Sequence, residues 1–187
     1  MLRLALLGGE SSGKTSLALA LAAALRTAWV PEYGRELWER VRHTLGVDEL
    51  LQVARTQIDR EEAALARLGP QPRGTWLVCD TTPLTTLQYC VYDHGSAPPA
   101  LEAMARRPYD AIVVCEPDFD FVQDGARRDA AFRAAQHAWT LAQLHRFGMD
   151  WLSVGGSLAR RLDAVIAHLQ ARVGRAADNQ APEQLHG

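Results

Sequence analysis

Cysteine is scarce in this sequence of 187 residues, and its three thiols suggest no paired arrangement. Cys79, Cys90 and Cys115 are an odd number, and no C-x-x-C spacing occurs among them. Two of the three lie in apolar runs, where a thiol packs like a small hydrophobic side chain. This usage is typical of reduced thiols, and it predicts a cytoplasmic protein.

Long hydrophobic runs are also missing. The longest uniformly apolar stretch covers residues 17–25. It is much shorter than the about 20 residues that a helix needs to span a bilayer. Residues 1–7 are too few for a signal peptide. We therefore expect no membrane partner, and residues 17–25 are predicted to form a buried helix.

Charge of one sign is not in excess either, because 20 Lys and Arg stand against 22 Asp and Glu. Without a global basic field, the chain is not expected to bind nucleic acid. The six histidines lack an H-E-x-x-H or similar spacing, and we expect His137, His145 and His168 on helix surfaces. The length fits one domain, which we place at residues 1–173, and residues 174–187 are expected to be a disordered tail.

The sequence does contain a complete G-x-x-x-x-G-K-[ST] motif from Gly8 to Thr15, between an apolar run and a helical pattern. Glycines at positions 8 and 13 let the backbone close into a ring of inward-pointing N–H groups. That ring lies at a helix N-terminus, where unpaired N–H groups and the macrodipole attract phosphate oxygens. The motif therefore predicts a Walker A phosphate-binding loop.

The ligand expected for this loop is ATP with Mg2+. The Lys14 ammonium reaches the β- and γ-phosphates and contributes to catalysis, and the Thr15 hydroxyl binds Mg2+. The residues expected to hold the nucleotide are Gly8, Gly9, Glu10, Ser11, Ser12, Gly13, Lys14, Thr15 and Ser16.

Short apolar runs alternate with helical patterns along the whole chain. The runs are at residues 2–7, 28–30, 76–80, 111–115 and 151–154. This alternation predicts an α/β fold: a doubly wound parallel five-stranded sheet flanked by helices, of the P-loop nucleoside and nucleotide kinase type. Ligands of such sheets bind at the carboxyl ends of the strands, so the chemistry is expected in the loops after the first four strands.

Helix boundaries follow from the same patterns. Helices are expected at residues 14–26, up to about 45, and at 48–68, 86–92, 100–106, 130–147 and 157–173. In the helix at 48–68, Asp48 is the expected N-cap. Its buried side is predicted to carry Leu51, Ala54, Ile58 and Leu65.

Asp80 ends the third apolar run, as a Walker B acid does beside Mg2+. We therefore predict a metal-linked, catalytic role for it. The structural alternative is an aspartate that caps Thr82 or Thr85.

Two further clusters follow strand ends. Glu32, Tyr33 and Arg35 combine a carboxylate, a ring and a guanidinium, which suits proton transfer and the binding of a second substrate. They also fit the start of an amphipathic helix with solvated charges. After the fourth strand come Asp124, Arg127 and Arg128, and paired arginines on a loop can neutralise a phosphoryl group in transfer. An ordinary solvated loop is the alternative there. Gly155-Gly156-Ser157, before the last helix, is a weak signal for an adenine site.

Taken together, these motifs resemble the NadR-type ribosylnicotinamide kinase family. The resemblance covers residues 2 to about 170 and rests on four stretches: Gly-Gly-Glu-Ser-Ser-Gly-Lys-Thr, Glu-Tyr-Gly-Arg-Glu, Asp80-Thr81 and Asp124-Gly125-x-Arg127. It implies ATP- and Mg2+-dependent phosphorylation of the 5′-hydroxyl of nicotinamide riboside, a step of NAD salvage.

The resemblance also suggests residue roles. Glu32, Tyr33, Arg35 and Asp124 become expected substrate residues, and residues 118–129 an expected lid. Glu32 is then the general base, although Glu32 and Asp80 could exchange roles, and Arg127 and Arg128 stabilise charge. Pro31 stands where the family usually has Trp, and Phe121 where a Trp precedes the lid motif. A ring lost at position 31 leaves a different nucleoside-like acceptor as an alternative.

One alternative from another class is a regulatory ATP-binding module with negligible turnover. The cluster at Glu32, Tyr33 and Arg35 argues against it, because a regulator needs no second small substrate. A GTPase is disfavoured because no N-K-x-D motif occurs. An oligomeric AAA+ motor would need an additional helical domain.

Overall fold

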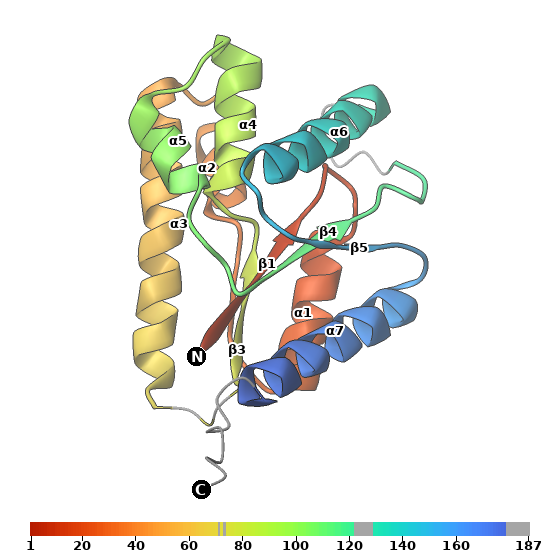
Figure 1. Ribbon diagram of the computed structural model, residues 1–187. Coiled ribbons are helices and arrows are strands. Elements are labelled where there is room, and N and C mark those ends of the chain that lie inside the picture. The colour runs from red at the N-terminus through yellow and green to blue at the C-terminus, as the bar shows by residue number, and fades with distance from the viewer. Residues whose placement is uncertain (71, 73, 122–128, 179–187) are drawn as a thin grey trace, which may run out of the picture.

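The computed structural model describes residues 1–70, 72, 74–121 and 129–178. Its centre is a parallel five-stranded sheet in the order β2-β3-β1-β4-β5. The strands are β1 (Leu2–Leu7), β2 (Trp29–Val30), β3 (Trp76–Asp80), β4 (Ala111–Cys115) and β5 (Leu152–Val154). The predicted fold class is therefore confirmed (Figure 1).

Helices connect the strands and cover both faces of the sheet (Figure 1). They are α1 (Lys14–Leu25), α2 (Tyr33–Val41), α3 (Val47–Leu68), α4 (Pro83–His94), α5 (Pro99–Ala105), α6 (Ala130–Arg146) and α7 (Leu158–Asp178). None of the described helices is long and apolar enough to cross a membrane.

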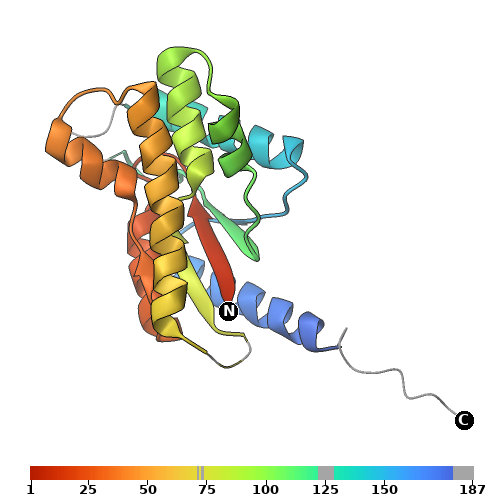
Figure 2. The same cartoon turned by 90° about the vertical axis from the view of Figure 1, so that its left-hand side faces the viewer.

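Alternation along β1 sends its side chains into two separate cores. Leu4 and Leu6 pack in the core under α1 and α7. Ala5 and Leu7 pack in the core under α3, α4 and α5. Figure 2 shows α2, α3 and α4 side by side on this second face. Both faces of β1 are thus covered, which explains why the strand is apolar throughout.

Helix α2 ends earlier than expected, at Val41 rather than near Leu45. Arg42 adopts a left-handed conformation with φ 55° and donates its backbone N–H to the Trp38 carbonyl at 2.8 Å. This arrangement ends the helix. The chain can then reach α3, which packs against α2.

The N-cap of α3 is Gly46 and not Asp48, so that prediction was wrong. The Glu49 carboxylate accepts the Gly46 backbone N–H at 2.8 Å, which binds one of the donors at the helix start. Asp48 lies in the first turn, where its negative charge faces the positive end of the helix dipole.

The buried face of α3 also differs from the expected one. Of the four predicted positions only Ala54 is buried. The buried residues are Leu50, Val53, Ala54, Gln57, Glu61 and Ala64. Gln57 and Glu61 belong to this face because the interior supplies polar partners for them, which an apolar pattern does not reveal.

The last helix continues to Asp178, beyond the end expected at Val173. The start of the predicted tail, from residue 174, is therefore helical. Residues 179–187 lie outside the described part of the chain.

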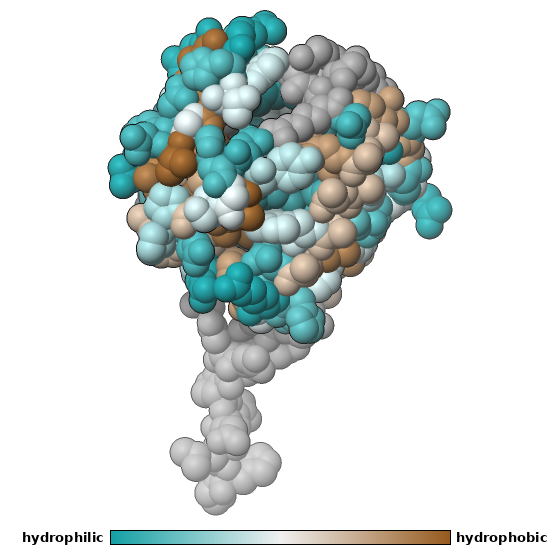
Figure 3. Space-filling model, turned by 90° about the horizontal axis from the view of Figure 1, so that it is seen from above, coloured by the Kyte–Doolittle hydropathy of each residue, from teal (hydrophilic) through white to brown (hydrophobic). Residues whose placement is uncertain are grey.

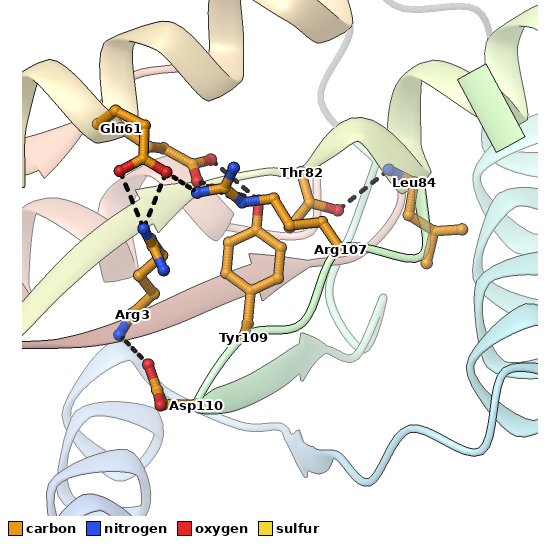
Figure 4. A network of polar contacts seen from close by, with 8 residues as sticks. Arg3, Glu61, Thr82, Leu84, Arg107, Tyr109 and Asp110 are labelled. Carbon is orange, nitrogen blue, oxygen red and sulfur yellow. Dashed lines mark hydrogen bonds and ion pairs between the residues drawn. The ribbon is translucent and has the colours of Figure 1, made fainter. Parts of the chain in front are cut away.

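Glu61 is a carboxylate with no exposed surface, and it lies at the interface of α3 with the segment that leads into β4 (Figure 4). The Tyr109 hydroxyl donates to its Oε1 at 3.0 Å, and Arg107 Nε lies 3.7 Å from its Oε2. Burial raises the pKa of Glu61 to about 7, although Tyr109 and Arg107 oppose the shift. Near neutral pH the folded protein therefore holds a proton that the unfolded chain releases.

We expect this proton to make stability depend on pH. Because the native state binds it more tightly, the free energy of unfolding should fall by about 3 kcal/mol as the pH rises from the ordinary value of 4.5 to about 7. Glu61→Gln, which can still accept from Tyr109, should remove most of that slope in urea titrations at several pH values.

Glu62→Gln is the matched control. Ion pairs with Arg107 and Arg3 lower the pKa of the neighbouring Glu62, and this carboxyl is half exposed. Removing the Glu62 charge should not change the fall in the free energy of unfolding between pH 4.5 and 7. An unchanged slope in Glu61→Gln would contradict the assignment.

Candidate functional site: a phosphate loop and an acid-lined cavity

The Walker A segment connects β1 to α1 and has the conformation that its glycines permit. Gly8 has a φ of +144° and Gly13 a φ of +79°. A Cβ placed on Gly8 would lie 2.8 Å from the Cys115 carbonyl oxygen and 2.7 Å from Ser12 Oγ. The loop is thus packed against the end of β4, and only glycine fits at position 8.

Lys14 lies over this loop. Its ammonium donates to the carbonyls of Gly8 at 2.8 Å and Gly9 at 2.9 Å. A lysine ammonium has three donors, so one remains to bind a phosphate oxygen. The loop therefore provides a fixed positive charge beside its backbone N–H groups.

Asp80 lies against the start of α1. The Thr15 hydroxyl donates to its Oδ2 at 2.7 Å, and only 1% of Asp80 is exposed. Its other oxygen, Oδ1, is buried without a partner among the described residues. Burial raises the pKa of this carboxyl, against the effects of Lys14 and of the Thr15 hydrogen bond.

This geometry fits a hydrated Mg2+. A hydroxyl next to a carboxylate with a free oxygen is a donor set that Mg2+ prefers, and the ion commonly keeps water molecules between itself and a carboxylate. No group of three or more His, Cys, Asp or Glu side chains suited to a metal occurs among the described residues. Substrate phosphates would have to complete the coordination.

The capping alternative for Asp80 is not what the structure has. Thr82 is the N-cap of α4, and its hydroxyl accepts the Leu84 backbone N–H at 3.1 Å (Figure 4). Thr81, between the two, has a φ of +83°, which is strained for a β-branched residue. Such strain commonly occurs at functional sites.

Helices α4 and α6 contact the loop from the face of the sheet opposite to α1. Tyr89 on α4 donates its hydroxyl to Glu10 Oε1 at 2.8 Å. The side-chain oxygen of Gln136 on α6 accepts the Glu10 backbone N–H at 2.8 Å. The backbone carbonyl of Gln136 accepts from the side-chain amide of Gln88 at 2.8 Å. Glu10, expected to bind the nucleotide, is thus anchored to two helices.

A cavity of about 440 Å³ opens beside the loop, a size typical of small-molecule sites. Figure 3 views the protein from the side of the strand carboxyl ends, and the described residues there are mainly hydrophilic or of intermediate hydropathy. The lining includes eight of the nine predicted loop residues, all but Gly9, together with Glu32, Gly34, Arg35, Trp38, Thr44, Leu45, Leu50, Val53, Gln57, Thr81, Thr85, Thr86, Tyr89, Asp93 and Gln136.

Glu32 faces this cavity from the start of α2. It occupies the N-cap position, but its side chain makes no capping hydrogen bond. Burial raises its pKa above the ordinary value of 4.5; Lys14 opposes the rise and Asp80 adds to it. The predicted base and the phosphate loop thus share one cavity.

The other two members of that cluster lie differently. Arg35 lines the cavity and pairs with Glu39 at 3.3 Å. Tyr33 does not line it, contrary to our expectation. Its ring lies under the guanidinium of Arg60, 4.5 Å from the ring centroid. The helix that begins here points neighbouring side chains in different directions.

Trp38 and Gln57 are cavity residues that the sequence analysis missed. Trp38 follows one turn after Arg35 on α2, so helical spacing was the available signal. Gln57 is buried, and its Oε1 accepts the Tyr33 backbone N–H at 3.0 Å. This bond fixes the orientation of the amide, and its Nε2 has no partner among the described residues.

His137 was predicted to lie on a helix surface, but its side chain is only 15% exposed. Its Nε2 lies 3.0 Å from a carboxylate oxygen of Glu116, at the end of β4. The adjacent Gln136 contacts the phosphate loop, so this face of α6 is turned inward. The predicted residues Asp124, Arg127 and Arg128 lie outside the described residues.

The parallel sheet and the glycine-dependent loop at the end of β1 define a P-loop nucleotide-binding domain. The profile of a protein family described as an AAA domain matches residues 3–161. The chain belongs to this family.

Solved structures with a similar fold include two NadR proteins. One, in complex with NR, is 21% identical with a TM-score of 0.72, and the match covers 99% of this chain and 54% of that one. The other, in complex with NAD and AMP-PNP, is 19% identical with a TM-score of 0.68, and the match covers 99% and 51%. The chain spans about half the length of these NadR chains.

A nucleoside kinase also shares the fold. Deoxyadenosine kinase from M. mycoides, with dCMP and dCDP bound, is 9% identical with a TM-score of 0.54, and the match covers 90% of this chain and 99% of that one. At these identities the likeness concerns the fold. The resemblance to NadR-type proteins is confirmed at that level.

Gly8→Ala should disrupt the loop. The added Cβ meets the Cys115 carbonyl in a strained backbone conformation, so the loop must shift and lose affinity for phosphates. We expect at least a tenfold weaker affinity for a non-hydrolysable ATP analogue by calorimetry. The control is Gly95→Ala, at φ +76° with open space around it, which should cost about 1 kcal/mol of stability and leave binding unchanged. Equal binding by both variants would be evidence against the assigned loop.

Proposed function

We propose that this protein is an ATP- and Mg2+-dependent kinase that phosphorylates the 5′-hydroxyl of a nucleoside-like acceptor, with nicotinamide riboside as the first candidate. The observation that carries the proposal is that Glu32, a carboxylate suited to take a proton, shares one cavity with the phosphate loop. The same cavity also includes Trp38 and Gln57, which leaves room for a second small substrate beside the loop.

The loop supplies the donor half of the site. Backbone N–H groups and the remaining Lys14 donor would bind the ATP phosphates, and Thr15 and Asp80 would hold the hydrated Mg2+. Bound there, Mg2+ supplies positive charge that neutralises the β- and γ-phosphates.

Glu32 supplies the base in this proposal. The acceptor hydroxyl attacks the γ-phosphorus, the bond from that phosphorus to the bridging oxygen breaks, and ADP leaves. The hydroxyl proton passes to the Glu32 carboxylate. Arg127 and Arg128 keep their predicted role of stabilising the transferring group, and the exchange of roles between Glu32 and Asp80 stays an alternative.

The acceptor would extend along the cavity away from Lys14. Gln57 Nε2 offers a donor to a hydroxyl or amide oxygen, and Trp38 offers a ring for a base to stack on. Support for nicotinamide riboside comes from the similar fold of a NadR protein solved with NR. In this chain Trp38 provides a ring that Pro31 does not.

Glu32→Gln should lower kcat at least about 100-fold, because an amide cannot accept the proton. Affinity for the ATP analogue should stay within about threefold of the wild type. In the wild type kcat/KM should decline as the pH falls, because the base form of Glu32 is lost through a pKa above 4.5. The measurement is a coupled ADP-release assay over pH with a panel of ribosides.

Two controls accompany this test. Glu36→Gln changes a carboxylate one turn along α2 that binds Arg60 outside the cavity, and it should keep its activity. Asp80→Asn tests whether Asp80 rather than Glu32 is the general base. Of the two variants, only the one that lacks the base should lose the decline of kcat/KM at low pH. The kinase proposal fails if the wild type phosphorylates none of the ribosides faster than Lys14→Ala does. Tight ATP binding without turnover would favour a regulatory module.

Trp38→Ala should raise the KM for the riboside about tenfold, the effect of losing one base-stacking ring. The KM for ATP should not change, and Trp38→Phe should recover most of the loss. Steady-state kinetics with each substrate varied would separate the two effects. A parallel rise in both KM values would mean that Trp38 acts through the fold rather than through the acceptor.

A further inference from the structure

One hydrogen bond joins the turn between α2 and α3 to the end of α4. His94 is the last residue of α4, and its Nε2 lies 2.9 Å from the carbonyl oxygen of Leu45. A carbonyl oxygen only accepts, so the imidazole is the donor. In Figure 2 the connection from α2 to α3 lies at the same end of the molecule as the end of α4. The bond therefore joins two elements that are 49 positions apart in the sequence.

This bond lies at the wall of the acceptor cavity. Thr44 and Leu45 line the cavity from the turn, and Asp93, the neighbour of His94, lines it from α4. His94 itself is not a lining residue. The imidazole thus supports the wall from behind and does not face a molecule in the cavity.

The cavity extends along α4 from the phosphate loop to this bond. Thr85, Tyr89 and Asp93 all line it, and each is one helical turn after the one before. Two turns of helix span about 12 Å. Thr85 lies in the first turn of α4, soon after the end of β3, whereas Asp93 is beside His94. The turn of residues 42–46 therefore closes the end of the cavity that is far from the phosphate loop.

Among the described residues, the other hydrogen bonds of this turn go to α2 and α3. Glu49 accepts the Gly46 backbone N–H at 2.8 Å, and the same carboxylate lies 3.2 Å from His43 Nε2. The Arg42 guanidinium donates to a backbone carbonyl of α2 at 2.9 Å. These bonds fix the turn to the two helices that it connects. Of the hydrogen bonds of the turn, only that of His94 reaches α4.

The two partners of the bond differ in their surroundings. Leu45 is 9% exposed and packs in the core under α3, α4 and α5. His94 is exposed, so water can replace its imidazole as the donor. A hydrogen bond that water can replace adds little to the stability of a whole domain. Its loss should therefore release the turn locally and leave the fold intact.

We propose that His94 is a positioning residue for the acceptor: its hydrogen bond to Leu45 holds the turn of residues 42–46 against α4 and so closes the far end of the cavity. The proposal rests on the proposed function. A nucleoside with its 5′-hydroxyl at the γ-phosphate points its base toward that far end, where Thr44 and Leu45 would limit its length. The ATP phosphates bind at the other end and do not contact the turn.

Two variants separate the donor from the ring. His94→Phe keeps a ring without a donor, whereas His94→Gln places an amide nitrogen close to the position of the imidazole Nε2. His94→Phe should raise the KM for the best riboside about three- to tenfold, the range for one lost hydrogen bond, and leave the KM for ATP within about twofold. His94→Gln should keep both values within about twofold of the wild type. A benzyl group on the base of the riboside should be tolerated at least about threefold better by His94→Phe, measured as the ratio of kcat/KM values.

Amide hydrogen exchange tests the position of the turn without any acceptor. Amides of residues 42–46 should exchange about three- to tenfold faster in His94→Phe than in the wild type or in His94→Gln, and those of α6 at the same rate in all three. His145→Phe is the matched control. His145 is exposed in the last turn of α6 and does not line the cavity, so its loss should change neither exchange in the turn nor the kinetics.

Unchanged exchange in the turn of His94→Phe would overturn the proposal. Equal rises in both KM values, or a loss of riboside affinity that His94→Gln does not restore, would also overturn it. Faster exchange in a protein that phosphorylates no riboside would support the role of His94 in holding the turn and refute the proposed kinase function instead.

Discussion

The structure depends on one constraint: the phosphate loop must be held, by partners from several helices, in the conformation that can bind an anion. Lys14 takes the carbonyls of Gly8 and Gly9, and Arg161 takes that of Ser12. Tyr89 and Gln136 bind the side chain and the N–H of Glu10. These partners come from α1, α4, α6 and α7, so helices on both faces of the sheet fix a single turn of chain. A loop held this way loses little conformational entropy when a phosphate binds.

The parts predictable from sequence were those set by neighbours in the chain. The loop motif and the apolar strands are local patterns, and they gave the correct sheet. They also led us to expect Thr15 and Asp80 at one Mg2+ site, and the two side chains are in contact. Side chains whose role depends on distant partners were not predictable. Glu61 is buried because Tyr109 reaches it from another element, and Gln57 because it accepts the Tyr33 N–H. For the same reason the polarity of α3 predicted the wrong buried face.

Acidic groups dominate the cavity beside Lys14. Glu32 and Asp80 both have pKa values raised by burial, and each is opposed by the charge of Lys14. Of these two, only Glu32 lines the cavity; Glu10 and Asp93 line it as well, while Arg35 adds a second positive charge. An acceptor that carried its own phosphate would be repelled by this acidic lining, because charges interact strongly in a partly buried site. For the proposed kinase activity, this charge distribution favours a neutral or cationic nucleoside over a nucleotide as acceptor.

The phosphate loop separates two surfaces built by different parts of the chain. On one side, α2 and α3 present Glu32, Trp38 and Gln57 to the cavity. On the other, the loops after β4 and β5 present Phe119, held by Arg161. The two surfaces share a partner, because Arg161 binds the carbonyl of Ser12 and Ser12 also lines the cavity. Energetic effects at sites that share a partner are commonly not additive. Substitutions on the two surfaces are therefore expected to influence each other through the loop that both surfaces share.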